Sequence, residues 1–200
     1  MKPALYIGIM SGTSLDGVDA VLADLSSGVA VLAHVHQPFA DALRTELLAL
    51  NRSGADELHR AALAGNALAC AYAGAVQELL AAGAVNRADV RAIGAHGQTV
   101  RHRPAEFDGT GYTIQILNPA VLAELSRIDV VADLRSRDLA AGGQGAPLVP
   151  SFHREVFGRG GTTIAVLNMG GIANLTLLGA DGATRGFDCG PANALMDDWS

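Results

Sequence analysis

Two glycine-rich turns carry side chains suited to binding phosphate. The first, Gly12 to Gly17, reads GTSLDG, the second, Asn168 to Gly171, reads NMGG, and each lies between apolar segments. Backbone N–H groups and hydroxyls donate hydrogen bonds to phosphate oxygens, glycine lets the backbone approach closely, and a carboxylate can hold Mg²⁺ or its waters. Taken alone, the first turn is more simply an ordinary hairpin. Its recurrence at a matching place favours two hairpins that face each other across a cleft and clamp phosphate.

Lysine takes no part in either turn, because Lys2 is the only lysine among the 14 Lys and Arg residues. A Walker A loop and a protein-kinase nucleotide site each need a lysine on the phosphates, and a Schiff-base enzyme needs one as its nucleophile. The sequence therefore excludes these mechanisms within this span. A phosphate site made of amides, hydroxyls and Mg²⁺ remains.

The amino-acid composition argues against nucleic acid and membranes as partners of this protein. Half of the 200 residues are apolar, which is enough to bury a core. The net charge of -6 and the lack of a Lys or Arg run argue against nucleic acid. No membrane span or signal peptide is expected, so we expect a cytoplasmic protein in which Cys70 and Cys189 are reduced thiols.

The elements that must position the first turn begin with three predicted strands, Ala4–Met10, Gly17–Asp24 and Val29–His36. Apolar runs bounded by Gly, Ser and Asp are typical of such strands, and the first two form a hairpin around the turn. Periodic apolar residues predict helices over Asp41–Leu50 and Asp56–Ala82. Small side chains in the second helix favour close packing on a sheet.

Strands and helices then alternate. Val90–Ala95 is a buried-type strand that runs into the sequence HGQT, and Gly111–Leu117 is a second strand. Pro119 can open a helix that continues over Ala120–Ser126, and Ile128–Ala132 is another strand. This order predicts an α/β domain with a mixed sheet.

Three more strands are predicted around the second turn, Thr162–Leu167, Ile172–Leu178 and Thr184–Phe187. They repeat the pattern of strand, polar glycine turn and strand found at the N-terminus, which indicates the start of a second domain. We therefore expect one domain over residues 1–150 and the beginning of another over residues 151–200.

Longer motifs give this chain a family resemblance. The strings MSGTSLDGVD, HGQT, IDVVADLRSRD, AAGGQGAPLVP, LNMGGIAN and GFDCGPANALMD occur in order between Ile7 and Asp198. Together they resemble the anhydro-N-acetylmuramic acid kinase family, of the actin/hexokinase/Hsp70-like sugar kinases. The resemblance implies an actin-like ATPase (ribonuclease H-like) α/β fold, with a first domain and the start of a second.

The same resemblance implies a reaction and its ligands. The family uses ATP, Mg²⁺ and water to convert 1,6-anhydro-N-acetylmuramate into N-acetylmuramate 6-phosphate, in peptidoglycan recycling and amino-sugar catabolism. A homodimer is expected by the same analogy. The resemblance assigns the nucleotide phosphates to both hairpins, at Gly12, Thr13, Ser14, Leu15, Asp16, Gly17, Val18, Asp19, Asn168, Gly170 and Gly171.

Four further residues take roles from the resemblance. Asp188 would be the general base that deprotonates the attacking water, although Asp188 could also simply cap a helix with Pro191 in its first turn. His96 and Gln98 would contact the sugar, or merely form a hydrogen-bonded turn. Arg135 could grip the lactyl carboxylate with its planar fork. Asp16 and Asp188 are candidates to hold Mg²⁺ through water.

Two alternatives to this enzyme stay open. The adenosine-binding glycine turn of the superfamily has no candidate after residue 190, so the chain could be a non-catalytic ligand-binding lobe. It could also be a related kinase acting on another amino sugar. The stretch Ala140–Phe152 is expected to lack regular structure and either lines the sugar pocket or links the domains.

Overall fold

The computed structural model describes residues 3–193 and 199. They form two compact units, each considered by itself below. Unit 1 comprises residues 1–102 and 113–134, and unit 2 comprises residues 103–112 and 135–200.

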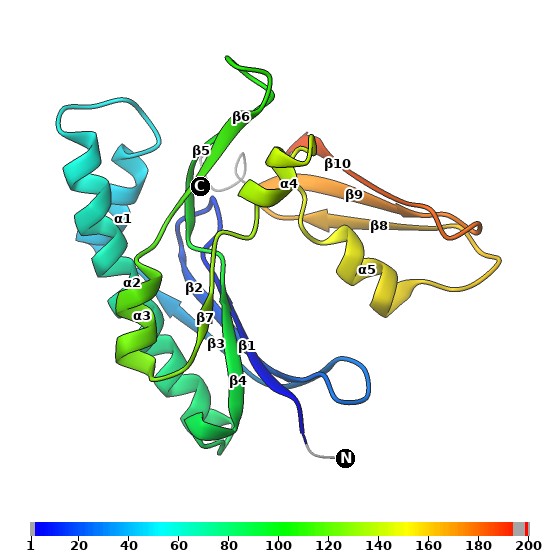
Figure 1. Ribbon diagram of the computed structural model, residues 1–200, viewed down its shortest axis with the longest axis horizontal. Helices are drawn as coiled ribbons and strands as arrows, with labels where there is room; N and C mark the ends of the chain where they lie inside the picture. Colours follow the sequence, from blue (N-terminus) through cyan, green and yellow to red (C-terminus); the bar gives the residue numbers. More distant parts are fainter. Residues whose placement is uncertain (1–2, 194–198, 200) are drawn as a thin grey trace. The chain divides into compact units, whose positions relative to one another are not determined.

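Unit 1 is built on a five-stranded sheet in the order β3-β2-β1-β4-β7 (Figure 1). β1 pairs antiparallel with β2 and β2 with β3, whereas β1–β4 and β4–β7 are parallel. The predicted α/β domain with a mixed sheet is confirmed. The strands span Leu5–Met10 (β1), Gly17–Asp24 (β2), Ala30–Pro38 (β3), Val90–Ala95 (β4) and Val130–Val131 (β7).

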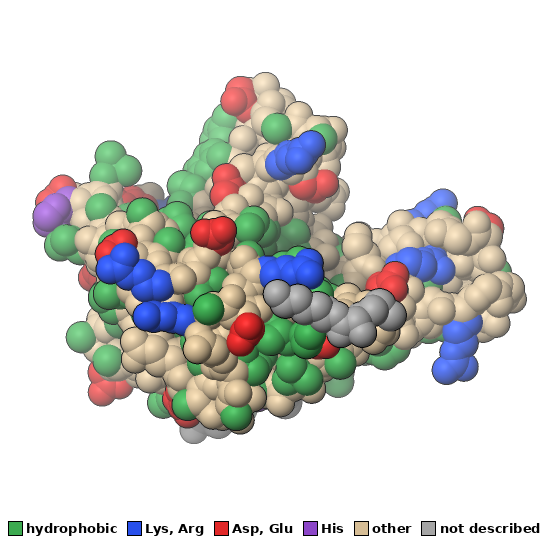
Figure 2. All heavy atoms as spheres, turned by 60° about the horizontal axis from the view of Figure 1, so that its bottom comes forward, with side chains coloured by type: hydrophobic (Ala, Val, Ile, Leu, Met, Phe, Trp, Pro, Cys, Tyr) green, Lys and Arg blue, Asp and Glu red, His purple; other side chains and the backbone are tan. Residues whose placement is uncertain are grey.

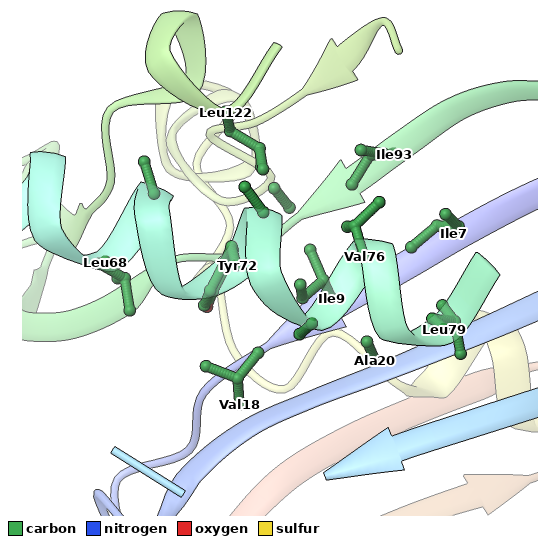
Figure 3. Close-up of a cluster of buried hydrophobic side chains, with 14 of the residues drawn as sticks. Ile7, Ile9, Val18, Ala20, Leu68, Tyr72, Val76, Leu79, Ile93 and Leu122 are labelled. Atoms are coloured by element: carbon green, nitrogen blue, oxygen red, sulfur yellow. The ribbon is translucent and has the colours of Figure 1, made fainter. Parts of the chain in front are cut away.

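Helices cover one face of this sheet (Figure 1). They are α1 (Asp41–Ala49), α2 (Glu57–Ala82) and α3 (Pro119–Ser126), and a short 3₁₀ turn, η1 (Arg87–Asp89), precedes β4. Alternate residues of the strands point toward α2, since successive side chains of a strand face opposite ways. Figure 3 shows the resulting core, in which side chains of β1, β2 and β4 meet one side of α2. Its labelled members are Ile7, Ile9, Val18, Ala20, Leu68, Tyr72, Val76, Leu79, Ile93 and Leu122.

A hairpin of β5 (Gln98–Pro104) and β6 (Gly111–Ile116) follows β4. β5 is missing from the prediction, because its alternation is carried by threonine, arginine and histidine rather than by apolar residues. Its tip, residues 103–112, belongs to unit 2.

Unit 2 contains an antiparallel sheet in the order β10-β9-β8, formed by Ile164–Met169 (β8), Ile172–Leu178 (β9) and Thr184–Pro191 (β10). α5 (Pro150–Phe157) packs on β9 and β10, and α4 (Ser136–Ala140) precedes it. The Nδ1 atom of His153 on α5 lies 2.9 Å from the Thr176 hydroxyl on β9, and both residues are buried.

Two predictions differ from the structure. The stretch Ala140–Phe152 contains the start of α5, because Pro150 occupies its first turn, where a missing N–H costs nothing. β10 continues to Pro191, so Asp188 lies in a strand rather than in a turn. Unit 2 takes in residues 135–150 as well as residues 103–112, and the domain boundary at residue 150 stays a prediction. The helix predicted with Pro191 in its first turn, which Asp188 could cap, falls largely on residues 194–198 and 200, outside the described residues.

Within the described ranges, no helix combines the length and apolar character needed to cross a bilayer. Charged side chains of both signs occur in small separate groups on the face seen in Figure 2.

Candidate functional site

The first glycine turn is organised by Asp16. One oxygen of its carboxylate, Oδ1, accepts a hydrogen bond from the Ser14 hydroxyl at 2.7 Å and from the Gly17 N–H at 3.0 Å. The Leu15 N–H donates to the Gly12 carbonyl at 3.2 Å and closes the turn. In the described part of the chain, the backbone N–H groups of Thr13 and Ser14 meet no protein acceptor. These two donors are therefore available to an anion such as phosphate.

The first turn is attached to the rest of unit 1 by a buried side chain and by hydrogen bonds to its backbone. The Leu15 side chain is buried, and the Leu15 carbonyl accepts a hydrogen bond from Arg44 Nε at 3.2 Å. The Phe39 N–H donates to the Asp16 carbonyl at 3.3 Å. At Gly17 a Cβ would overlap the backbone of β3, with Pro38 Cα only 2.9 Å away. Glycine is required here by the close approach of two strands.

Gln98 belongs to this anchor rather than to an open sugar pocket. It is 1% exposed, and its side-chain Nε2 donates to the Gly12 carbonyl at 3.1 Å. The neighbouring His96 ring holds its Nδ1 atom 2.7 Å from the Gly97 carbonyl, which fixes a proton on Nδ1. The structure thus brings His96 and Gln98 next to the first turn, and their contact with sugar stays a prediction.

Tyr72 ties the same two segments together from α2. Its hydroxyl lies 3.1 Å from Ser11 Oγ, and the Ser11 hydroxyl also reaches the Gly97 carbonyl at 3.5 Å. Burial raises the pKa of the Tyr72 hydroxyl well above its usual value, with hydrogen bonds from Ser11 and Gly97 opposing the shift. Sequence reasoning placed Tyr72 only on an apolar helix face, so its polar role was missed.

Val18 and Asp19 follow the turn on β2. Val18 is fully buried and offers only its backbone. Asp19 Oδ1 lies 3.1 Å from both His34 Nε2 and His36 Nδ1 on β3. Asp19 is thus engaged by two imidazoles across the sheet, a contact that no sequence spacing indicated.

The second glycine turn joins β8 to β9 through Gly170 and Gly171. The chain after β10 holds it, because the Asn193 N–H donates to the Gly170 carbonyl at 2.9 Å and the Ala192 N–H donates to the Gly171 carbonyl at 2.9 Å. Asn168 ends up inside β8, opposite Asn174 of β9.

Asp188 and Arg135 are near each other in unit 2. Burial lowers the pKa of the Arg135 guanidinium, and the negative charge of Asp188 opposes this shift. Asp188 itself is exposed on β10, opposite Asn174. Arg135 Nη1 also donates to the Gly145 carbonyl at 2.6 Å. The structure therefore brings together two residues that sequence reasoning placed 53 positions apart in separate predicted domains.

Arg135 is held by a folded loop, not by a flexible link. The Asp138 carboxylate accepts a hydrogen bond from the Gly145 N–H at 2.7 Å, and the Gly143 N–H donates to the Asp138 carbonyl at 2.8 Å. Gly145 has a φ of +70° and a Cβ there would overlap Leu139. The carboxylate of Asp138, three residues after Arg135, was the missed signal.

The metal prediction rests on Asp16 alone within unit 1. No group of three His, Cys, Asp or Glu side chains among the described residues could hold a metal ion. Among the described residues, the Asp16 carboxylate accepts two hydrogen bonds, both on Oδ1, which leaves Oδ2 for a cation or its waters. One carboxylate with substrate phosphates and waters is a usual way to bind Mg²⁺.

Comparison with known proteins identifies relatives of the whole chain. A family described as anhydro-N-acetylmuramic acid kinase matches residues 4–200. The chain is 65% identical over 206 residues to the anhydro-N-acetylmuramic acid kinase of Variovorax paradoxus strain S110, covering 100% of this chain and 55% of that protein. The enzyme of the same name from Albidiferax ferrireducens is 58% identical, with 98% of this chain and 56% of that protein covered.

The chain spans about half the length of the curated relatives that it matches. Among solved structures, the Aquifex aeolicus member of the Ppx/GppA family gives a TM-score of 0.42 at 12% identity, covering 98% of this chain and 54% of that one. No statement about function follows from a likeness of that degree. By the match over residues 4–200, the chain belongs to the anhydro-N-acetylmuramic acid kinase family.

Proposed function

We propose that the chain forms part of an ATP-dependent kinase that opens 1,6-anhydro-N-acetylmuramate. Water attacks the anomeric carbon and gives a proton to Asp188, and the bond from this carbon to O6 breaks. O6 takes the γ-phosphoryl group as the bond to ADP breaks, which yields N-acetylmuramate 6-phosphate and ADP. Because phosphorus captures the departing O6, a separate acid is less necessary than in ordinary acetal hydrolysis.

The family match over residues 4–200 supports this proposal, together with the electrostatic interaction between exposed Asp188 and the half-buried cation Arg135. A general base must be reachable by water, and the Asp188 carboxylate is exposed. Arg135 Nη1 donates to the Gly145 carbonyl, and a planar guanidinium with several donors suits a carboxylate such as the lactyl group of a muramic sugar.

The free N–H groups of Thr13 and Ser14 suit the phosphates of ATP, and Asp16 Oδ2 suits Mg²⁺ or its waters. When bound, Mg²⁺ would neutralise charge on the transferring phosphoryl group. The turn between β8 and β9 is the second phosphate contact that we propose. A homodimer, by family analogy, and the cytoplasmic location expected from the sequence complete the proposal.

The test is Asp188→Asn in the full-length enzyme, followed by ADP release with the anhydro sugar. We expect a loss of about 100-fold or more in kcat, as for removal of a general base, with an unchanged melting temperature. Near-normal turnover would contradict the role of Asp188.

The alternatives are separated by testing other substrates and by comparing this 200-residue chain with the full-length enzyme. Turnover of plain hexoses or another amino sugar by the unsubstituted enzyme would favour a different kinase. Sugar or ATP binding by these 200 residues without turnover, beside an active full-length enzyme, would make them a ligand-binding lobe of that enzyme. Binding without turnover in both would leave a non-catalytic protein.

A further inference from the structure

Asn174 stands between two residues already assigned to the site. It lies on β9, directly opposite Asn168 on β8 and directly opposite Asp188 on β10. Directly opposed residues of antiparallel strands point to the same face, with Cβ atoms about 4.5 to 5.5 Å apart. The three side chains therefore form a polar row across the sheet, with Asn174 at its centre.

The strands that carry this row pack against α5. Thr176 follows Asn174 on the same face of β9, is fully buried and contacts His153 of α5. Gly186 is opposite Thr176, and a Cβ there would overlap Pro150 of α5. α5 covers the face of β9 and β10 at Thr176 and Gly186. Asn174 and Asp188 are the next pair on that face, beside the part that α5 covers.

The amide of Asn174 carries an unexplained polar atom. Its Oδ1 is buried and, within the described residues, has no hydrogen-bond partner. A carboxylate only accepts hydrogen bonds, so only the nitrogen of this amide can bond to Asp188, and the oxygen is the atom left over. An apolar side chain at position 174, like those of Leu175 and Leu178, would not bury an unpaired oxygen. A hydrogen bond donated by the amide nitrogen would explain why asparagine occupies this position.

We propose that Asn174 is a positioning residue that orients the Asp188 carboxylate in the reacting enzyme by a hydrogen bond from Nδ2, a bond that these two described residues do not form in this structure. This inference rests on the proposed function. Asn174 holds the carboxylate on one side, while Arg135 supplies a positive charge nearby. The Asp188 oxygen that takes the proton from water is thereby kept at a fixed angle to the sugar.

The test is a series of substitutions at position 174 in the full-length enzyme, with kcat and KM measured for ATP and for the anhydro sugar. Asn174→Ala removes the donor, and we expect kcat to fall about 10- to 100-fold with KM for ATP unchanged, as for a misplaced catalytic group. Asn174→Asp keeps the size but places a second negative charge beside Asp188, and it should lose more. Asn174→Ser keeps a donor and should recover part of the kcat lost in the alanine variant.

Two controls make the outcome decisive. Asn86→Asp makes the same chemical change at the N-cap of η1, where aspartate also caps, and should leave kcat unchanged. Combining Asn174→Ala with Asp188→Asn should add no further loss, because the amide acts through that carboxylate. Full kcat in the alanine and aspartate variants, or an equal loss in the Asp188→Asn background, would overturn the inference. An unsubstituted enzyme that fails to turn over the anhydro sugar would instead contradict the proposed function.

Discussion

The two glycine hairpins have the same pattern of strand, polar turn and strand, yet they are held in different ways. The first turn is bonded to buried groups, Gln98 and, through Ser11, Tyr72, and it lies against β3. The second is held by backbone bonds from the chain after β10, and the flanking Met169 and Ile172 are 64% and 48% exposed. The same pattern thus gives one turn that is part of a core and one that is not.

The largest contrast is expected for one added methyl group. Gly17→Ala would drive a Cβ into the β3 backbone, so the free energy of unfolding should fall by about 3 kcal/mol, the upper end for overpacking. Gly170→Ala should change it by less than about 0.5 kcal/mol, because its nearest atom is Ile172 O at 3.7 Å. Urea unfolding of both variants measures the difference. Equal losses would show that the two turns are held alike.

A smaller effect is expected for Tyr72→Phe, which removes the hydroxyl next to Ser11. Loss of this buried hydrogen bond should cost about 1 to 2 kcal/mol in urea unfolding. The raised pKa of Tyr72 adds a pH signature. The folded protein keeps the proton that the unfolded chain loses above pH of about 10, so stability falls as pH rises beyond that value. In the phenylalanine variant, the free energy of unfolding should fall less steeply as pH rises above about 10. The same slope in both proteins would show that another group causes the decline.

The smallest change in stability is expected for Gln98→Met. This substitution loses the bond to Gly12 but also removes an amide oxygen, Oε1, that is buried without a partner in the described structure. The two effects oppose each other, so unfolding should change by less than about 1 kcal/mol. The freed turn should nevertheless bind ATP more weakly, which isothermal titration of the full-length enzyme measures. Unchanged affinity would separate Gln98 from the phosphate turn.

The sequence predicted most elements because their apolar periodicity agrees with their burial, as on α2 and β1. It predicted β5 and α5 poorly, since β5 alternates polar side chains and α5 begins within a run of glycine and proline. The site residues were found through motifs, but their partners were not. Tyr72 contacts Ser11, 61 positions away, and Asn174 lies opposite Asp188 on the neighbouring strand, and no local pattern encodes such pairings.

The bonds from Gln98 and Tyr72 also bear on how this protein can evolve. Loops usually tolerate variation because they are loosely connected to the packed elements that they join. The first turn lacks that freedom, since changes in α2 or β5 reach it through buried hydrogen bonds. If the first turn binds phosphate as proposed, sequence drift in the core is constrained by ligand binding as well as by folding, and new specificities should arise more readily around the second turn and the Arg135 loop.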